Sequence, residues 1–97
     1  MPATVHVIAR FLAKPGKEEE LKGVLTALIP PTRREVACYQ YDLLSNPADP
    51  REFCVIERWE SDAALDQHLA TPHVQTALAQ AEPLIEEGPD VRRYHLL

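Results

Sequence analysis

The stretch ERWESDAALDQHLATPH, residues 57–73, contains the signals that set the order of the elements around it. An apolar run ends at Trp59, and Ser61 follows as a good helix N-cap, because its hydroxyl can accept a backbone hydrogen bond. Thr71 and Pro72 repeat this signal, with proline at the first helical position. The stretch therefore predicts the end of a strand, a short helix and the start of a second helix.

The remaining elements lie on both sides of this corner. A turn-rich segment, residues 46–50, separates two apolar runs and predicts a hairpin. Apolar residues at helical spacing follow Lys17, and Pro30-Pro31 is expected to end or kink that helix, because proline removes a hydrogen-bond donor. Gly88-Pro89 is expected to close the last helix. Strands are predicted over residues 4–12, 36–45, 51–60 and 90–97, and helices are predicted to begin near residues 17, 61 and 72.

This β-α-β-β-α-β order predicts an α+β, ferredoxin-like fold, in which a four-stranded antiparallel sheet carries its helices on one face. An antiparallel sheet with one face in water would alternate cleanly between apolar and polar residues. Here the first strand places Ile8 and Leu12 opposite the apolar set that contains Val7, and Cys54 and Ile56 do the same in the third. Since the helices cover one face only, a second copy of the sheet is expected to cover the other, which predicts a homodimer.

Length and composition predict one domain over residues 1–97. The net charge is −5, from 15 acidic and 10 basic residues, and this argues against nucleic acid as a partner, because phosphate binding needs concentrated positive charge. No apolar run approaches the roughly 20 residues of a membrane span, so no membrane partner is expected. The N-terminal residues lack the order of a signal peptide, and a cytoplasmic protein is expected.

The two cysteines, Cys38 and Cys54, are expected to be free thiols. If their strands pair as a hairpin, residue 38 lies opposite roughly residue 58, which leaves Cys54 about four positions, or about 13 Å, away. A disulfide needs Cα atoms within about 7 Å. The spacing therefore predicts two buried, unpaired thiols.

The most specific short motifs lie in the opening stretch: Glu57 and Trp59 at the end of a strand, then SDAAL (61–65), His68 and Thr71-Pro72-His73. Further motifs, KPGKEEEL (14–21), Tyr39-x-Tyr41, Pro50-x-x-Phe53 and VRRYHLL (91–97), extend the set over essentially the whole chain. In this order and at this spacing, the motifs resemble the antibiotic biosynthesis monooxygenase family. The chain is most similar to the small quinol-oxidising branch, and the resemblance implies ferredoxin-like subunits that pair through their sheets into a dimeric α/β-barrel.

The resemblance also implies a reaction and a site. The expected activity is a cofactor-independent monooxygenase that oxidises a quinol or polyphenol with O₂, so the expected partners are a small aromatic substrate and O₂, with no cofactor. Imidazole suits the role of proton acceptor for a phenolic hydroxyl because its pKa lies near neutral pH. The expected catalytic residues are His68, Trp59 and Glu57, and the expected substrate contacts are Tyr39, Tyr41 and Val55.

Structural roles compete with these catalytic ones. Trp59 is either a core aromatic residue or the wall of a cavity. His68 is either a hydrogen-bonded core residue or a base, and a catalytic His68 would open into a pocket whereas a structural one would be sealed. Glu57 has the parity of Trp59, so it is expected on the inward face with a partner, which is His68, a tyrosine or an arginine. His73 is expected to be a capping or surface residue.

Metal, flavin and nicotinamide chemistry are not supported by the sequence. His68 and His73 stand five positions apart across a helix start, a spacing that matches no familiar metal site, so no metal is predicted. The chain has no glycine-rich phosphate loop, so a flavin or nicotinamide enzyme is not supported. Haem-degrading relatives rely on an asparagine in the first strand, and VHVIARFLA (5–13) contains none, which argues against that activity. Two alternatives remain. The first is a non-catalytic, dimeric module that binds a small ligand or acts in a stress response, and the second is a haem-binding or haem-degrading relative.

Overall fold

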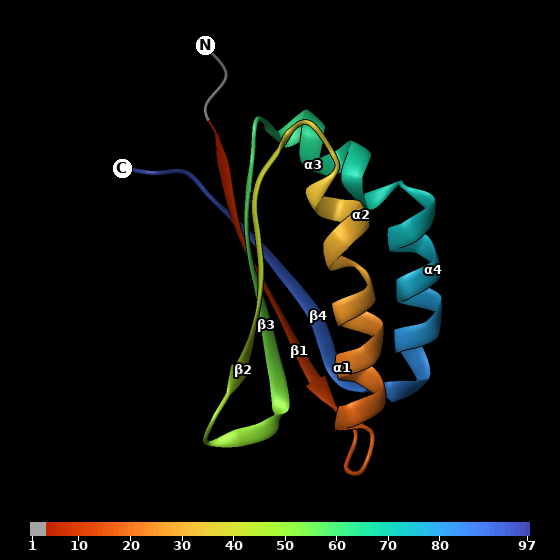
Figure 1. The fold of residues 1–97 in the computed structure, drawn as a ribbon. Coiled ribbons are helices and arrows are strands. Elements are labelled where there is room, and N and C mark those ends of the chain that lie inside the picture. The colour runs from red at the N-terminus through yellow and green to blue at the C-terminus, as the bar shows by residue number, and fades with distance from the viewer. Residues whose placement is uncertain (1–3) are drawn as a thin grey trace.

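A computed structural model of the protein describes residues 4–97 (Figure 1). Four strands and four helices follow one another, with a short 3₁₀ turn before the last strand. In chain order they are β1 (Val5–Ala13), α1 (Glu18–Ala27), α2 (Ile29–Arg33), β2 (Cys38–Asn46), β3 (Asp49–Trp59), α3 (Asp62–Leu69), α4 (Pro72–Ala81), η1 (Glu82–Leu84) and β4 (Ile85–Tyr94).

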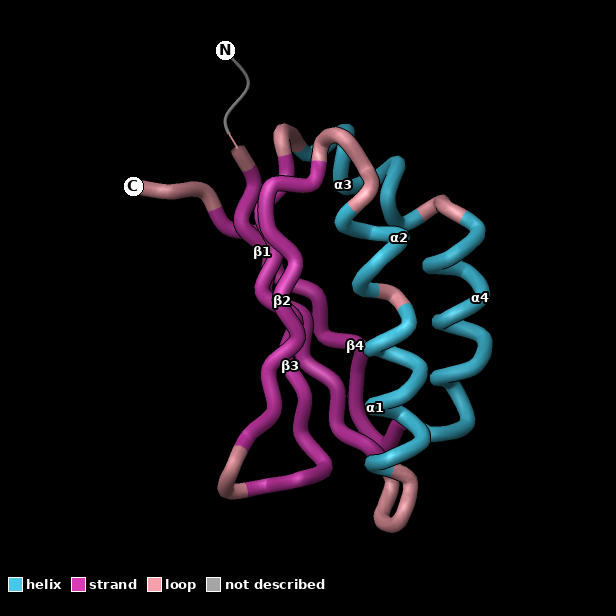
Figure 2. The backbone as a smooth tube through the Cα atoms, viewed as in Figure 1, coloured by secondary structure: helices cyan, strands magenta, loops and turns pink. Residues whose placement is uncertain are grey.

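The strands form one antiparallel sheet in the order β2-β3-β1-β4, so the two central strands are β1 and β3. The helices all lie on one side of this sheet, with α1 and α4 side by side along it (Figure 2). This two-layer arrangement confirms the predicted ferredoxin-like fold. No helix among the described residues is long and apolar enough to cross a membrane.

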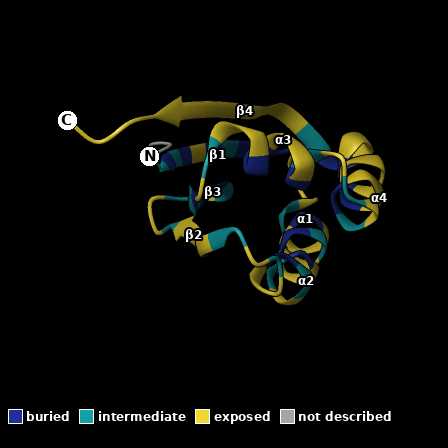
Figure 3. Ribbon diagram, turned by 90° about the horizontal axis from the view of Figure 1, so that it is seen from above, coloured by how far each residue is buried: buried dark blue, intermediate teal, exposed yellow. Residues whose placement is uncertain are grey.

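The core lies between the sheet and the helices (Figure 3). Alternate residues of the central strands point into it, and β1 and β3 pair so that Val5 lies opposite Trp59 and Ala9 opposite Val55. Because side chains alternate along a strand, Glu57 falls on this same buried face, between Val55 and Trp59. The register therefore places a carboxyl group in an otherwise apolar layer.

The opposite face of the sheet carries apolar side chains that no helix covers. Ile8, Leu44 and Tyr94 are exposed there, and Ile56, which pairs with Ile8, is half-buried. This is the two-sided apolar pattern that the sequence shows.

Of the two predictions that rest on prolines, the one at Pro30-Pro31 is confirmed and the one at Gly88-Pro89 is wrong. Pro30 and Pro31 interrupt the first helix as expected, since α1 ends at Ala27 and α2 begins at Ile29, where prolines in the first turn lose no helical hydrogen bond. The prediction that Gly88-Pro89 closes a helix is wrong, because β4 begins at Ile85 and runs through both residues.

Gly88 is needed inside this strand by its backbone conformation. The pairing of β1 with β4 shifts register between Arg10 and Leu12, and Gly88 lies at this irregularity with φ of +97°. A Cβ atom there would lie 2.5 Å from the carbonyl oxygen of Arg10, closer than any side chain tolerates. The glycine therefore marks a bulge in the strand rather than the end of a helix.

The prediction that the two cysteines form no disulfide is correct, and the prediction that they are buried is wrong. Cys38 pairs with Trp59 and Cys54 pairs with Leu44 across the β2-β3 hairpin, so the two thiols stand far apart in register and are both free. Both are half-exposed rather than buried.

Candidate active site

His68 lies in the last turn of α3 and packs against two aromatic rings of the sheet. Its ring centroid is 4.4 Å from that of Trp59, with the planes 36° apart, and 5.9 Å from that of Tyr41, which meets it edge-on. Trp59 and His68, two of the expected catalytic residues, are therefore in contact. His68 is only 3% exposed and Trp59 is completely buried, so both are sealed by protein, which is the state expected of a structural His68 rather than of one that opens into a pocket.

Glu57 finds its hydrogen-bond partner two residues along its own strand. The indole Nε1 of Trp59 donates to Glu57 Oε1 at 2.9 Å, and both side chains are buried. The partners expected from the sequence, His68, a tyrosine or an arginine, are replaced by this indole. The contact arises because residues i and i+2 of a strand point to the same side.

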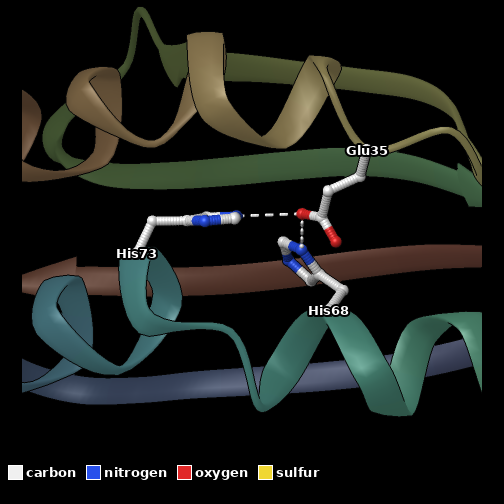
Figure 4. Close-up of side chains that lie close together, drawn as sticks. All are labelled: Glu35, His68 and His73. Carbon is white, nitrogen blue, oxygen red and sulfur yellow. Dashed lines mark hydrogen bonds and ion pairs between the residues drawn. The ribbon is translucent and has the colours of Figure 1, made fainter.

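Glu35, which the sequence did not single out, joins the two histidines. His68 Nδ1 lies 2.7 Å and His73 Nε2 lies 2.9 Å from the same carboxylate oxygen, Glu35 Oε2 (Figure 4). Glu35 comes from the turn between α2 and β2, and the histidines come from α3 and from the first turn of α4. His73 is thus a half-buried member of a polar cluster rather than the capping or surface residue expected for it.

The corner between α3 and α4 holds the two histidines in place. Ser61 caps α3 as predicted, accepting a hydrogen bond from the backbone N–H of Ala64. Thr71 does not cap α4 with its side chain. Instead its hydroxyl donates to the carbonyl oxygen of His68 at 2.7 Å, and its backbone N–H donates to the same oxygen at 3.1 Å. These two hydrogen bonds to one carbonyl oxygen fix the turn that brings His73 back toward His68.

Burial changes the protonation of the groups around His68. Desolvation raises the pKa of Glu57 to about 7, against the opposing effect of the Trp59 hydrogen bond, and the charge of Glu35 raises it further. Desolvation lowers the pKa of His68, although the hydrogen bond to Glu35 opposes this. The pKa of the Tyr41 phenol is raised, first by burial and then by the charge of Glu57. Perturbed groups gathered in this way are typical of functional sites.

The raised pKa of Glu57 makes stability depend on pH. Because its folded pKa of about 7 exceeds the ordinary 4.5, the stability that the uncharged carboxyl provides is complete below about pH 4.5 and is lost as pH rises through 7. The difference corresponds to about 3 kcal/mol. Between pH 4.5 and 8, we expect the free energy of unfolding to fall more for the wild type than for Glu57→Gln. The expected difference between the two falls is up to this amount. Urea denaturation across this range measures it, and parallel pH profiles would contradict the assignment.

The other predicted contacts divide between the site and the surface. Tyr41 is buried beside His68, and Val55 lies in the core on the same sheet face. Tyr39 is 47% exposed, and its ring lies under the guanidinium of Arg58 at 5.5 Å, away from His68. The structure therefore does not bring Tyr39 to the cluster. β2 has a register irregularity between Cys38 and Gln40, which separates the two tyrosines.

A groove reaches the cluster from the helix side. It has a volume of about 380 Å³, lies between α1 and α4, and is lined by His73, with Val24, Leu28 and Gln80 among its other residues. The side chain of His73 is 25% exposed and that of Glu35 is 20% exposed. The cluster therefore has a buried end at His68 and an accessible end at His73.

Comparison with known proteins assigns the chain to a family. The family model described as antibiotic biosynthesis monooxygenase matches residues 4–80, which include both central strands, α3 and most of α4. The chain belongs to this family. The resemblance noted in the sequence motifs is thereby confirmed.

Individual members of the monooxygenase family are similar over nearly the full chain. "Putative monooxygenase Rv0793" of Mycobacterium tuberculosis is 41% identical over 88% of this chain and 83% of its own length. Its solved structure superimposes with a TM-score of 0.92 at 36% identity, covering 98% of this chain and 96% of that one. "Putative monooxygenase YcnE" of Bacillus subtilis is 32% identical over 91% of this chain and 93% of its own.

In this family member the Glu35 carboxylate orients the imidazole rings of both histidines. If His68 Nδ1 donates its proton to Glu35, the lone pair of the neutral ring lies on Nε2, and the same reasoning gives His73 a lone pair on Nδ1. One carboxylate thus fixes the tautomer of two potential bases. The stacked Trp59 restrains the ring of the buried one.

Proposed function

We propose that the protein is a cofactor-independent monooxygenase that oxidises a quinol or a related polyphenol with O₂. Its base is His68, whose Nδ1–H is held by Glu35 Oε2 at 2.7 Å. This hydrogen bond is the observation that carries the proposal, because a carboxylate on one ring nitrogen orients the other to accept a proton.

The reaction needs a base and an electron-rich substrate. Removal of a phenolic proton by His68 Nε2 gives an anion that transfers one electron to O₂. Recombination of the semiquinone with superoxide and loss of water then give a hydroxyquinone. Quinol and O₂ thus yield hydroxyquinone and water, with one atom of the O₂ in each product. The protein supplies orientation and a water-poor environment for the anion. Trp59 holds the plane of the base, while Tyr41 and the partly protonated Glu57 are polar groups near it.

The substrate has to reach a base that is covered in this conformation. Because His68 is 3% exposed, we expect binding of a flat ring to open the space between α3 and the sheet, with the groove at His73 as the entrance. A groove of about 380 Å³ falls within the size range of small-molecule sites. Dioxygen consumption by metal-free protein supplied with a reduced quinol tests the proposed function.

The burial of His68 also favours a second candidate, a non-catalytic dimeric module that binds a small ligand. In that case His68, Glu35 and His73 form a structural hydrogen-bond network, and His68 is sealed because it never exchanges protons with a substrate. The two candidates differ in turnover: the module would bind an aromatic ligand without consuming O₂.

We also propose that the protein is a homodimer that pairs through the uncovered sheet face, as a closed two-fold interface. Sedimentation at micromolar concentration is expected to give twice the chain mass of 10.9 kDa. Ile8→Glu combined with Leu44→Glu should shift the protein toward monomer, because it buries two charges in the interface. Val36→Glu, at a fully exposed turn residue, is the matched control. A folded wild-type monomer under these conditions would contradict the proposal.

A further inference from the structure

Three side chains that can bind a transition metal converge from separate parts of the chain. Glu35, His68 and His73 each offer one ligand atom, and these atoms all lie within 4.8 Å of one another. Figure 4 shows the two imidazoles pointing at one carboxylate oxygen from different helices. His68 and His73 stand 33 and 38 positions from Glu35 in the sequence. The tertiary fold, rather than one helix, therefore brings the three residues together.

The donor set has the composition of known metal centres. Two imidazole nitrogens and one carboxylate oxygen form the His₂Glu set of zinc enzymes and the 2-His-1-carboxylate set of non-haem iron. With metal–ligand bonds of about 2.0–2.1 Å, ligand atoms around a tetrahedral ion stand about 3.3 Å apart. The carboxylate oxygen lies 2.7 and 2.9 Å from the two nitrogens, and all three ligand atoms lie within 4.8 Å of one another, so side-chain rotations that bring these separations to about this value make room for an ion.

Charge favours a cation at this position. Among residues 4–97, the charged partners within ion-pair distance of Glu35 are the two histidines alone, so with neutral imidazoles no arginine or lysine offsets the carboxylate. A divalent cation would compensate the half-buried negative charge of Glu35.

Access is available on one side. His68 provides a buried ligand, whereas His73 borders the groove between α1 and α4. An ion entering through the groove would keep at least one coordination position open to water or to a small ligand, as three-ligand sites do.

We propose that Glu35, His68 and His73 form a binding site for a divalent transition-metal ion, with Zn²⁺ as the representative case. Coordination at His68 Nδ1 places the ring proton on Nε2 and removes the lone pair on which base catalysis depends. Metal binding therefore inhibits the oxygenase; this consequence rests on the proposed function, whereas the binding itself does not.

Calorimetric titration of chelator-treated, untagged protein with Zn²⁺ tests the site. We expect one ion per chain, a rise in melting temperature by mass action, and affinity at least tenfold weaker in Glu35→Gln and in His73→Ala. His95→Ala is the matched control, because His95 is exposed and pairs only with Asp62 among the described residues, and it should bind as the wild type does. Melting curves without metal verify that each variant folds.

Absence of saturable Zn²⁺ uptake, or unchanged affinity in both ligand variants, would overturn the metal site. Co²⁺ substitution gives a second readout, since visible absorption bands typical of a four-coordinate ion are expected in wild type and not in His73→Ala. Zn²⁺ binding that leaves dioxygen consumption unaffected would support the metal site and contradict His68 as the base.

Discussion

His68→Ala is expected to lower the rate of quinol-dependent dioxygen consumption by about 10²- to 10⁴-fold, the usual contribution of general-base catalysis. The substitution removes the nitrogen that we propose as acceptor of the phenolic proton and leaves Glu35 paired with His73 alone. An oxygen electrode, with substrate autoxidation subtracted, measures the effect.

The fold should survive this change, because Leu65 remains buried in α3 and Leu69 remains packed against the core. Circular dichroism and sedimentation verify this. His73→Ala keeps the His68–Glu35 hydrogen bond and is the matched control, with an expected loss of less than about tenfold in the absence of metal. Full activity in His68→Ala, or the larger loss in His73→Ala, would show that His68 is not the base.

Trp59→Ala is expected to reduce the free energy of unfolding by about 3–5 kcal/mol, the typical cost of deleting a buried tryptophan side chain. Trp59 is completely buried, stacks on His68 and donates the hydrogen bond that Glu57 receives. Its removal leaves both a cavity and an unpaired carboxyl group. Urea denaturation at pH 7 measures the change.

A series of variants separates these two effects. Trp59→Phe keeps most of the ring but removes the N–H donor, so a smaller loss of about 1–3 kcal/mol is expected, together with a further rise in the pKa of Glu57. Tyr39→Ala removes an exposed aromatic side chain of the same sheet and should cost about 1 kcal/mol or less. If Trp59→Ala were no more destabilising than Tyr39→Ala, Trp59 would not anchor this part of the core.

The features near the opening stretch could be predicted because they depend on local rules. Ser61 caps its helix through its own hydroxyl, and strand parity alone places Glu57 and Trp59 on one face. The contact between Trp59 and His68 follows once the helix is known to fold back over the sheet.

Glu35 could not be found in this way. It lies in a turn without periodic pattern, and its importance depends on a contact with His68 that only the tertiary fold creates. The contact of His73 with Glu35 depends on the tertiary fold in the same way. A glycine before a proline suits a helix end as well as a bulge inside a strand, and the carbonyl oxygen of Arg10 that makes Gly88 necessary is far away in sequence.

Dioxygen uptake by chelator-treated wild-type protein tests most directly whether this family member oxidises a quinol without a cofactor. We expect consumption well above the autoxidation rate, one O₂ per quinol, a hydroxyquinone product and no requirement for added metal or flavin. Uptake no faster than with heat-denatured protein, while quinol still quenches the fluorescence of the single tryptophan, Trp59, would contradict the oxygenase and favour the non-catalytic binding module.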